Sequence, residues 1–286
     1  AALLKVSAPG ISRLVKHTEE TLGVRLFERK AGLFVPSTEA KTVFDQIQQV
    51  HEKLDNLGYA LKTLQKGGEV ELAFASVPSL AQFIASRAIR RLRRRFPDLY
   101  IDLNILKIEE AIDYLLLERG EFVAMSYALD NPSLECERLA EGEILAIVPE
   151  SHPLASRGEV SARELAGEPL IGVDPSDPYG AIVAAPLRAA GLAIRHSIRA
   201  RFAQTVVSLV RHGLGVALID EFSVAESQMP GLARLRLAES AAISAYAVKK
   251  RGRVLSSFAE YAIEQLRLEL KAAVASRPSA AVPARD

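Results

Sequence analysis

The amino-acid sequence predicts a multidomain α+β chain, made of a short helix with a hairpin, a coiled-coil helix and two α/β lobes. Three observations predict it. Apolar residues first recur at helical spacing, then repeat every 3.5 residues, and from about residue 69 onwards strands and helices alternate. Such alternation is typical of parallel sheets flanked by helices, and its restart near residues 130–142 predicts two lobes.

The bulk properties fit a soluble protein and exclude few functions. A chain of 286 residues is long for one core and suits two or three domains. The net charge of +1 gives no global reason for nucleic-acid binding, so that hypothesis depends on local clustering. The single cysteine, Cys136, excludes an internal disulfide framework and fits a reducing, cytoplasmic compartment.

Residues 1–37 are expected to form a helix end, a second helix and a hairpin. Ser7 is a good helix N-cap, Pro9 suits the first turn, and Gly23 ends the helix. The segments "VRLFERK" and "GLFVPS" lie on either side of Ala31-Gly32, which predicts a two-stranded wing with a tight turn.

The second helix has two different faces. Its apolar face is formed by Ile11, Val15, Thr18 and Leu22, and its opposite face by Pro9, Ser12, Arg13 and Lys16. A hydroxylated, basic N-terminal half is what a recognition helix presents to the major groove of DNA. The alternative is an amphipathic surface helix whose polar face is only solvated.

Residues 38–67 are expected to form a linker helix that ends at Gly67-Gly68. Its apolar positions step by four and three residues in turn, which is the period of a coiled coil. The helix therefore predicts dimerisation through one narrow stripe, formed by Val43, Ile47, Val50, Leu54, Leu57, Leu61 and Leu64. The alternative is a long helix that lies on its own domain.

Residues 68–275 carry the two lobes, with lobe I at about 68–142 and 246–275 and lobe II at about 143–245. Strands are expected at 69–75, 99–106, 122–129, 143–150, 169–174, 194–200, 215–222 and 246–250. Helices are expected at 79–96, 108–120, 161–167, 179–191, 205–213 and 254–270. Residues 276–286 are predicted to be a disordered tail.

Two lobes with a cleft are a ligand-binding design, and three strand ends run into polar helix starts. Helix N-termini suit an anion such as a carboxylate. The candidate effector-binding residues are Ser76, Ser79, Asp174, Asp177, Tyr179, Gln204 and Thr205. Asp174 and Asp177 favour an amino-acid-like effector, the alternative being that each is an N-cap.

The chain resembles the LysR-type transcriptional regulators. The match is carried by "VSAPGISRLVKHTEETLGVRLFER" at residues 6–29, "HPLA" at 152–155 and "LVRHGLGVALI" at 209–219. The resemblance implies a partial winged helix-turn-helix, a coiled-coil linker helix and a two-lobed, periplasmic-binding-protein-like effector domain. It also implies operator DNA, a small-molecule effector and a homodimer or homotetramer as partners.

The resemblance also identifies expected DNA contacts, and two places where this sequence differs from the family pattern. The expected DNA-binding residues are Ser7, Pro9, Ser12, Arg13, Lys16, Arg29 and Lys30. Ala8 stands where the family commonly has Gln, which leaves base readout to three of these residues: Ser12, Arg13 and Lys16. Gly120–Val123 replaces an Asp-containing strand start. By comparison with the family, the sequence is expected to lack about 20 N-terminal residues, the ordinary size of a helix and its connections.

No catalytic, metal or cofactor motif is present. The histidines show no ligand spacing, and no nucleophile lies in a motif with a base. The run at Arg90–Arg95 is interpreted as a solvated helix end rather than a second DNA contact. The main alternative function is a solute-binding receptor with the same two-lobed fold, which predicts a secretion signal and a monomer.

Overall fold

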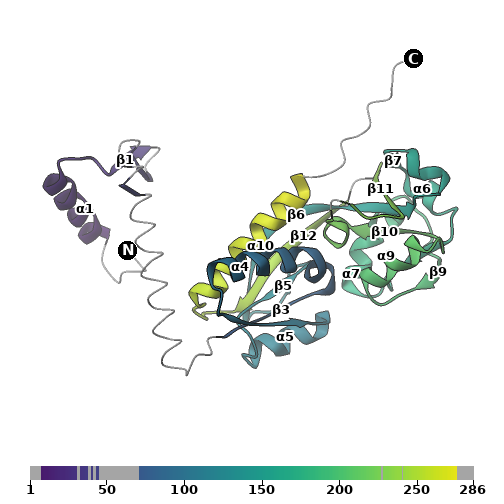
Figure 1. Ribbon diagram of the computed structural model, residues 1–286, viewed down its shortest axis with the longest axis horizontal. Helices are drawn as coiled ribbons and strands as arrows, with labels where there is room; N and C mark the ends of the chain where they lie inside the picture. Colours follow the sequence, from purple (N-terminus) through teal and green to yellow (C-terminus); the bar gives the residue numbers. More distant parts are fainter. Residues whose placement is uncertain are drawn as a thin grey trace, which may run out of the picture. The chain divides into compact units, whose positions relative to one another are not determined.

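The computed structural model describes residues 8–30, 33–37, 40, 43–44, 71–226, 228–239 and 241–275. The chain divides into two compact units, Ala1–Val70 and Glu71–Asp286, which are described separately (Figure 1). Ser7, the coiled-coil stripe from Ile47 onwards and the predicted tail lie outside the described residues.

The first unit contains the predicted helix and hairpin. Helix α1 (Ala8–Leu22) ends at Gly23, whose φ of +68° is a left-handed conformation that favours glycine. Strands β1 (Phe27–Lys30) and β2 (Leu33–Pro36) pair antiparallel, with Lys30 opposite Leu33. The predicted end of the second helix at Gly23 and the two-stranded hairpin are therefore confirmed, whereas the helix end predicted before Ser7 lies outside the described residues.

Glu19 ties the hairpin to the helix. Its carboxylate accepts hydrogen bonds from the backbone N–H groups of Leu26, at 2.7 Å, and Phe27, at 3.0 Å. Because an ionised acceptor strengthens a hydrogen bond, these two bonds position the hairpin relative to α1.

Lobe I of the second unit is a mixed sheet with the strand order β4-β3-β5-β12-β6. Its strands are β3 (Glu71–Ser76), β4 (Tyr100–Ile105), β5 (Val123–Met125), β12 (Ala242–Lys250) and the first part of β6 (Leu134–Pro149). Strands β3, β4 and β5 run parallel, but β12 pairs antiparallel with both β5 and β6. The sheet is therefore mixed, whereas the alternation of elements predicted a parallel sheet.

The helices of lobe I lie close to the positions that the sequence predicts. Helix α3 (Pro78–Leu80), the π-turn η1 (Ala81–Ala85) and α4 (Ser86–Arg95) form one continuous helical stretch, and α5 is Ile108–Leu116. The last helix, α10 (Ser257–Ala275), packs on α4 (Figure 1). Arg87 and Arg91 of α4 both bond the buried carboxylate of Glu269 on α10.

Strand β6 joins the two lobes. It is one strand of 16 residues that pairs with β12 in lobe I and with β10 and β11 in lobe II. The sequence predicts only its second half, because residues 134–142 carry charged side chains that obscure the strand pattern.

Lobe II has the strand order β6-β10-β8-β9, with β11 and the short β7 beside it. Its strands are β7 (Glu159–Val160), β8 (Leu170–Gly172), β9 (His196–Arg199), β10 (Val216–Asp220) and β11 (Leu232–Leu237). Its helices are α6 (Ala162–Leu165), α7 (Pro178–Val183), α8 (Ala185–Ala189) and α9 (Ala203–Arg211), with 3-10 turns η2 (Pro153–Ser156) and η3 (Glu221–Val224).

The helix expected at 179–191 is two helices, α7 and α8. Pro186 lies in the first turn of α8, where its missing N–H cannot continue the hydrogen-bond ladder of α7. The break leaves α7 as a short element at the edge of the cleft between the lobes.

Candidate ligand-binding cleft

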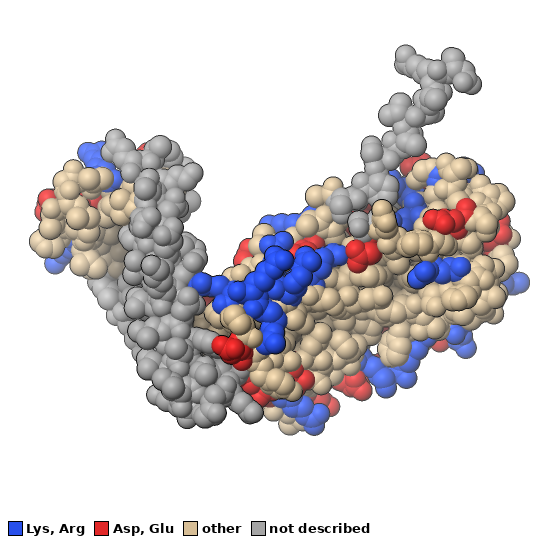
Figure 2. Space-filling view, viewed as in Figure 1, with Lys and Arg blue, Asp and Glu red and all other residues tan. Residues whose placement is uncertain are grey.

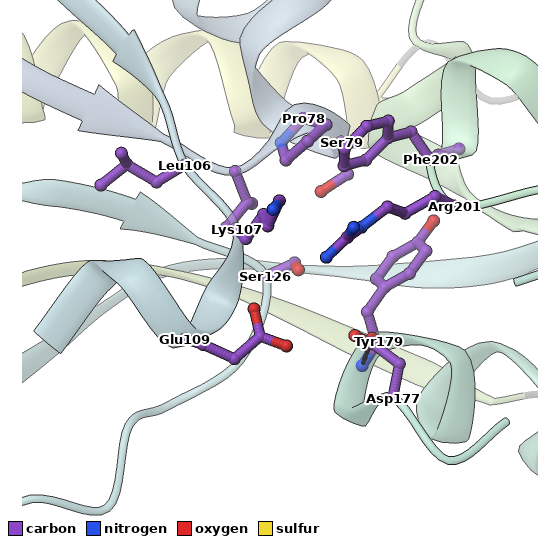
Figure 3. Close-up of a pocket in the computed structure, with 12 residues that line it drawn as sticks. Pro78, Ser79, Leu106, Lys107, Glu109, Ser126, Asp177, Tyr179, Arg201 and Phe202 are labelled. Atoms are coloured by element: carbon purple, nitrogen blue, oxygen red, sulfur yellow. Dashed lines mark hydrogen bonds between the residues drawn. The ribbon is translucent and has the colours of Figure 1, made fainter. Parts of the chain in front are cut away.

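A cleft with about 480 Å³ of empty space, open to solvent, lies between the two lobes (Figure 3). Lobe I contributes Val77, Pro78, Ser79, Leu106, Lys107, Glu109 and Ser126, and lobe II contributes Asp177, Tyr179, Arg201, Phe202 and Ala203. Its mixture of apolar and polar side chains is typical of small-molecule sites.

Two helix N-termini open on the cleft from opposite lobes. The long helical stretch that begins with α3 follows Val77, and α9 follows Phe202; within the described residues, neither N-cap side chain accepts a hydrogen bond from its helix. The first residue of α3, Pro78, has no N–H, but the other free N–H groups of the two first turns and the positive dipole ends remain available to an anion. Helix α7 differs, because the carboxylate of Asp177 accepts from the N–H groups of Tyr179 and Gly180.

Ser79 and Arg201 add two donors beside these helix ends. The Ser79 hydroxyl is buried and has no hydrogen-bond partner in the part of the chain that the structure describes. The guanidinium of Arg201 points into the cleft in Figure 3, and no ion pair to it is found among the described residues. A buried donor without a partner costs free energy, so a ligand oxygen at this position would satisfy it.

Two acidic side chains also line the cleft. Glu109 on α5 points into the cleft, and Asp177 lies on the wall formed by lobe II (Figure 3). Burial raises the pKa of the Tyr127 hydroxyl far above its usual value, and the charges of Asp177 and Glu109 raise it further. The hydroxyl has no hydrogen-bond partner within the described ranges. The cleft thus contains two carboxylates together with the donors Ser79, Arg201 and Lys107.

Tyr179 connects the cleft to a buried carboxylate. Its hydroxyl donates to Oδ2 of Asp220 at 2.5 Å, and both side chains are buried. Burial raises the pKa of Asp220 and also raises the pKa of Tyr179, because the charged form of each loses its hydration.

The seven candidate effector residues divide into two groups. Ser79, Asp177 and Tyr179 line the cleft. The others have different surroundings: Ser76 is buried and donates to the carbonyl of Val77, Asp174 pairs with Arg199 at 2.8 Å, and Thr205 is exposed. Gln204 donates across the lobes to the carbonyl of Pro78.

Sequence reasoning missed Lys107, Glu109, Ser126 and Arg201. Arg201 directly precedes the N-cap Phe202, so its place beside a helix start was a usable signal. Glu109 was not recognisable as a cleft residue from the sequence, because an acidic residue in the first turn of a helix is ordinary. The acidic residue with which it shares the cleft, Asp177, comes from the other lobe.

The candidate DNA-binding residues lie on α1 and β1 of the first unit. Pro9, Ser12, Arg13 and Lys16 are exposed, and Lys16 is 3.7 Å from Glu20. The opposite face is less uniform than the helical pattern predicts, since Ile11 and Val15 are half-buried whereas Leu22 is exposed. The backbone of Arg29 and Lys30 is in β1, but their side chains lie outside the described residues, as Ser7 does entirely.

Val43 is the one member of the predicted dimerisation stripe whose side chain is described, and it is exposed.

Basic side chains also gather over α4 in Figure 2. Arg93 donates to the carbonyl of Leu99, and Arg90 and Arg94 are exposed, as expected of a solvated helix end, whereas Arg91 pairs with the buried Glu269. No helix in the described ranges combines the length and apolarity that crossing a membrane requires.

Two α/β lobes that share a cleft lined by both acidic and basic side chains define a small-molecule-binding domain. The family model for the LysR substrate binding domain matches residues 65–271, so the chain belongs to the LysR family. It is a LysR-type transcriptional regulator with an effector-binding domain. Membership of this family favours the regulator over the solute receptor and over an enzyme.

Known relatives and structures agree with this family. The chain is 22% identical over 223 residues to the transcriptional regulator DgcR of a Pseudoalteromonas species, covering 78% of this chain and 77% of that protein. It is 25% identical over 235 residues to the transcriptional activator LysR of Escherichia coli K12, covering 81% and 75%. The structure of a Corynebacterium glutamicum OxyR C206 mutant is similar in fold, with a TM-score of 0.63, 20% identity, and coverage of 96% and 88%.

Proposed function

We propose that this regulator senses a small carboxylate, and specifically an amino-acid-like compound, in the cleft between its lobes. The observation that carries the proposal is the pair of uncapped helix N-termini, at α3 and α9, that face the same space. The effector carboxylate would accept hydrogen bonds from their N–H groups, from the Ser79 hydroxyl and from Arg201.

The amino group of the effector would lie toward Glu109 and Asp177. Both side chains line the cleft, and the charge of each also raises the pKa of the buried Tyr127 hydroxyl. Asp174, the other aspartate in the sequence hypothesis, already pairs with Arg199 and Ser176. The proposal therefore assigns contact with the amino group of the effector to Glu109 and Asp177, instead of Asp174 and Asp177.

Isothermal titration calorimetry on the full chain tests the effector class. Amino acids, organic acids and the amines that result from removing the carboxyl group of each amino acid form the panel. We expect binding by at least one amino acid and none by its amine. Binding of neutral or cationic compounds with no binding of any carboxylate would contradict the proposal.

We further propose that the first unit binds operator DNA through α1 and the hairpin. Ser12, Arg13 and Lys16 are placed on the exposed face of α1, and Arg29 and Lys30 would contact phosphates from β1. Ser7 and Pro9 would approach the DNA at the start of the helix. Two chains paired through the stripe from Val43 to Leu64, as a homodimer or within a homotetramer, would present two such helices to a two-fold-related site.

Fluorescence anisotropy with operator and random DNA tests these roles. Changing Lys30 to Ala should weaken binding to both DNAs alike, whereas Arg13→Ala should also reduce the preference for operator. Equal behaviour of wild type and Arg13→Ala on both DNAs would remove Arg13 from base readout.

A further inference from the structure

A single buried carboxylate receives hydrogen bonds from both the cleft wall and a turn at the junction of the lobes. Tyr179, in the first turn of α7, reaches Oδ2 of Asp220 with its hydroxyl. Asp220 is fully buried at the end of β10. Because a buried carboxylate bonds strongly to the donors around it, α7 and β10 are held together at this point.

Asp220 also organises the turn η3, for which it is the N-cap. Its Oδ1 accepts from the backbone N–H of Ser223 at 3.0 Å, and its Oδ2 accepts from the Ser223 hydroxyl at 2.5 Å. Tyr179 and Ser223 thus share one acceptor oxygen, so a displacement of the Tyr179 ring changes the bonding of the turn directly.

Turn η3 is a part of lobe II that packs on lobe I. All four of its residues are buried, and it contacts α3, η1 and α10. The carboxylate of Glu221 accepts from the N–H of Glu143 on β6 at 3.0 Å. Just beyond the turn, Arg87 of α4 donates to the carbonyl of Ala225 at 2.9 Å.

The strand that joins the lobes is shaped to receive this turn. A Cβ placed on Gly142 of β6 would lie 2.8 Å from Cζ of Phe222 and 2.9 Å from Oε2 of Glu221. Contacts this close leave no room for a side chain, so η3 sits directly against the backbone where β6 passes between the lobes.

We propose that the Tyr179–Asp220 hydrogen bond couples occupancy of the cleft to the relative orientation of the two lobes. An effector in contact with the Tyr179 ring shifts α7, and Asp220 transmits this shift to η3 and from there to lobe I. Tyr179 and Asp220 are positioning residues in this role. The coupling rests on the proposed function only in requiring that a ligand occupies the cleft, because the bond itself sets the orientation without ligand.

Electron–electron resonance distances between two spin labels test the coupling in the full chain. Cysteines at Asp113 of lobe I and Ala189 of lobe II, both exposed, take the labels after Cys136 is changed to Ser. The test variants are Tyr179→Phe and Ser223→Ala. Tyr127→Phe is the matched control, because it also removes a buried tyrosine hydroxyl, but one that has no described hydrogen-bond partner.

Without ligand, we expect Tyr179→Phe and Ser223→Ala to broaden or shift the distance distribution, while Tyr127→Phe matches the wild type. An unchanged distribution in both test variants would overturn the coupling. If Tyr179→Phe fails to fold, as judged by thermal unfolding, Ser223→Ala decides the question from the side of the turn.

With the amino acid that binds most tightly in calorimetry, the wild type should show a shifted distance. Tyr179→Phe and Ser223→Ala should both lose the shift, and Ser223→Ala, which does not line the cleft, should keep the affinity within about threefold, a loss smaller than coupling energies of typical size. A shift of wild-type size in Tyr179→Phe would overturn the coupling. If no compound of the panel binds the wild type, the effector proposal fails, and the ligand-free distances still decide the coupling.

Discussion

The side-chain amide of Gln204, on α9, donates a hydrogen bond to the backbone carbonyl of Pro78, at the start of α3. The two residues belong to different lobes, so this bond crosses the cleft beside the two uncapped helix ends. It holds those ends near each other in the absence of ligand, which prepares the donors for one shared anion.

Removing this bond should loosen the pair of lobes. Gln204→Ala should lower the free energy of unfolding by about 1 kcal/mol, the usual net value of one such bond. Hydrogen exchange should increase at residues 79–80 and 203–206. Thr205→Ala, one residue further on, removes an exposed side chain and serves as the control. Equal exchange in both variants would show that the Gln204 bond does not join the lobes in solution.

Arg201 and Ser79 should decide the affinity for a carboxylate. We expect Arg201→Ala and Ser79→Ala each to weaken binding of the best amino acid by about tenfold, since each removes a donor to an ionised group. Arg199→Ala is the matched control, because Arg199 pairs with Asp174 and does not line the cleft. Calorimetry would contradict the site if the Arg199 and Arg201 variants lost affinity equally.

Gly142 should not tolerate a side chain. Gly142→Ala places a methyl group against Phe222 and Glu221, and overpacking of this kind costs about 1–3 kcal/mol. Chemical denaturation measures the change. Gly167→Ala is the control, since its Cβ would lie 3.5 Å from the carbonyl of Glu164, an ordinary contact. A Gly142 variant as stable as the Gly167 variant would mean that η3 does not press on β6.

Glu164 should remain ionised in acid. Hydrogen bonds from the backbone and then the side chain of Ser161, with help from Arg157, lower the pKa of Glu164 from 4.5 to about 2. A lowered pKa in the folded state stabilises the protein at pH values above 4.5, and this contribution is lost as the pH falls toward 2. The difference in melting temperature between wild type and Glu164→Gln should therefore shrink through that range. A constant difference would show that Glu164 has an ordinary pKa.

Local signals predicted the parts of the fold that depend on local chemistry. Gly23 ended α1 because a left-handed residue is needed there, and the Ala31-Gly32 turn predicted the hairpin. Strand β6 was predicted only in part, since its first half is defined by pairing with β12, more than a hundred residues later. Tertiary pairing of this kind leaves little trace in a short window of sequence.

The presence of a ligand-binding cleft was predictable from the sequence, but several of the residues that line it were not. Polar helix starts identified Ser79, Asp177 and Tyr179, which do line it. Asp174 carries the same sequence signal, yet Arg199 of β9 neutralises it, and that neighbour is visible only once β8 and β9 are paired. Glu109 lines the cleft only because the two lobes face each other. No sequence motif within one lobe predicts this arrangement.

The most direct test of the central claim is a DNA titration of the full chain with the fragment that flanks its gene, measured with and without the amino acid that binds in calorimetry. The account predicts that affinity falls steeply as salt rises, because phosphate contacts release counterions. It also predicts that the amino acid changes DNA affinity or half-site occupancy by at least about fivefold, the low end of typical coupling. DNA binding that is insensitive to salt and to every bound ligand would contradict a ligand-responsive DNA-binding regulator.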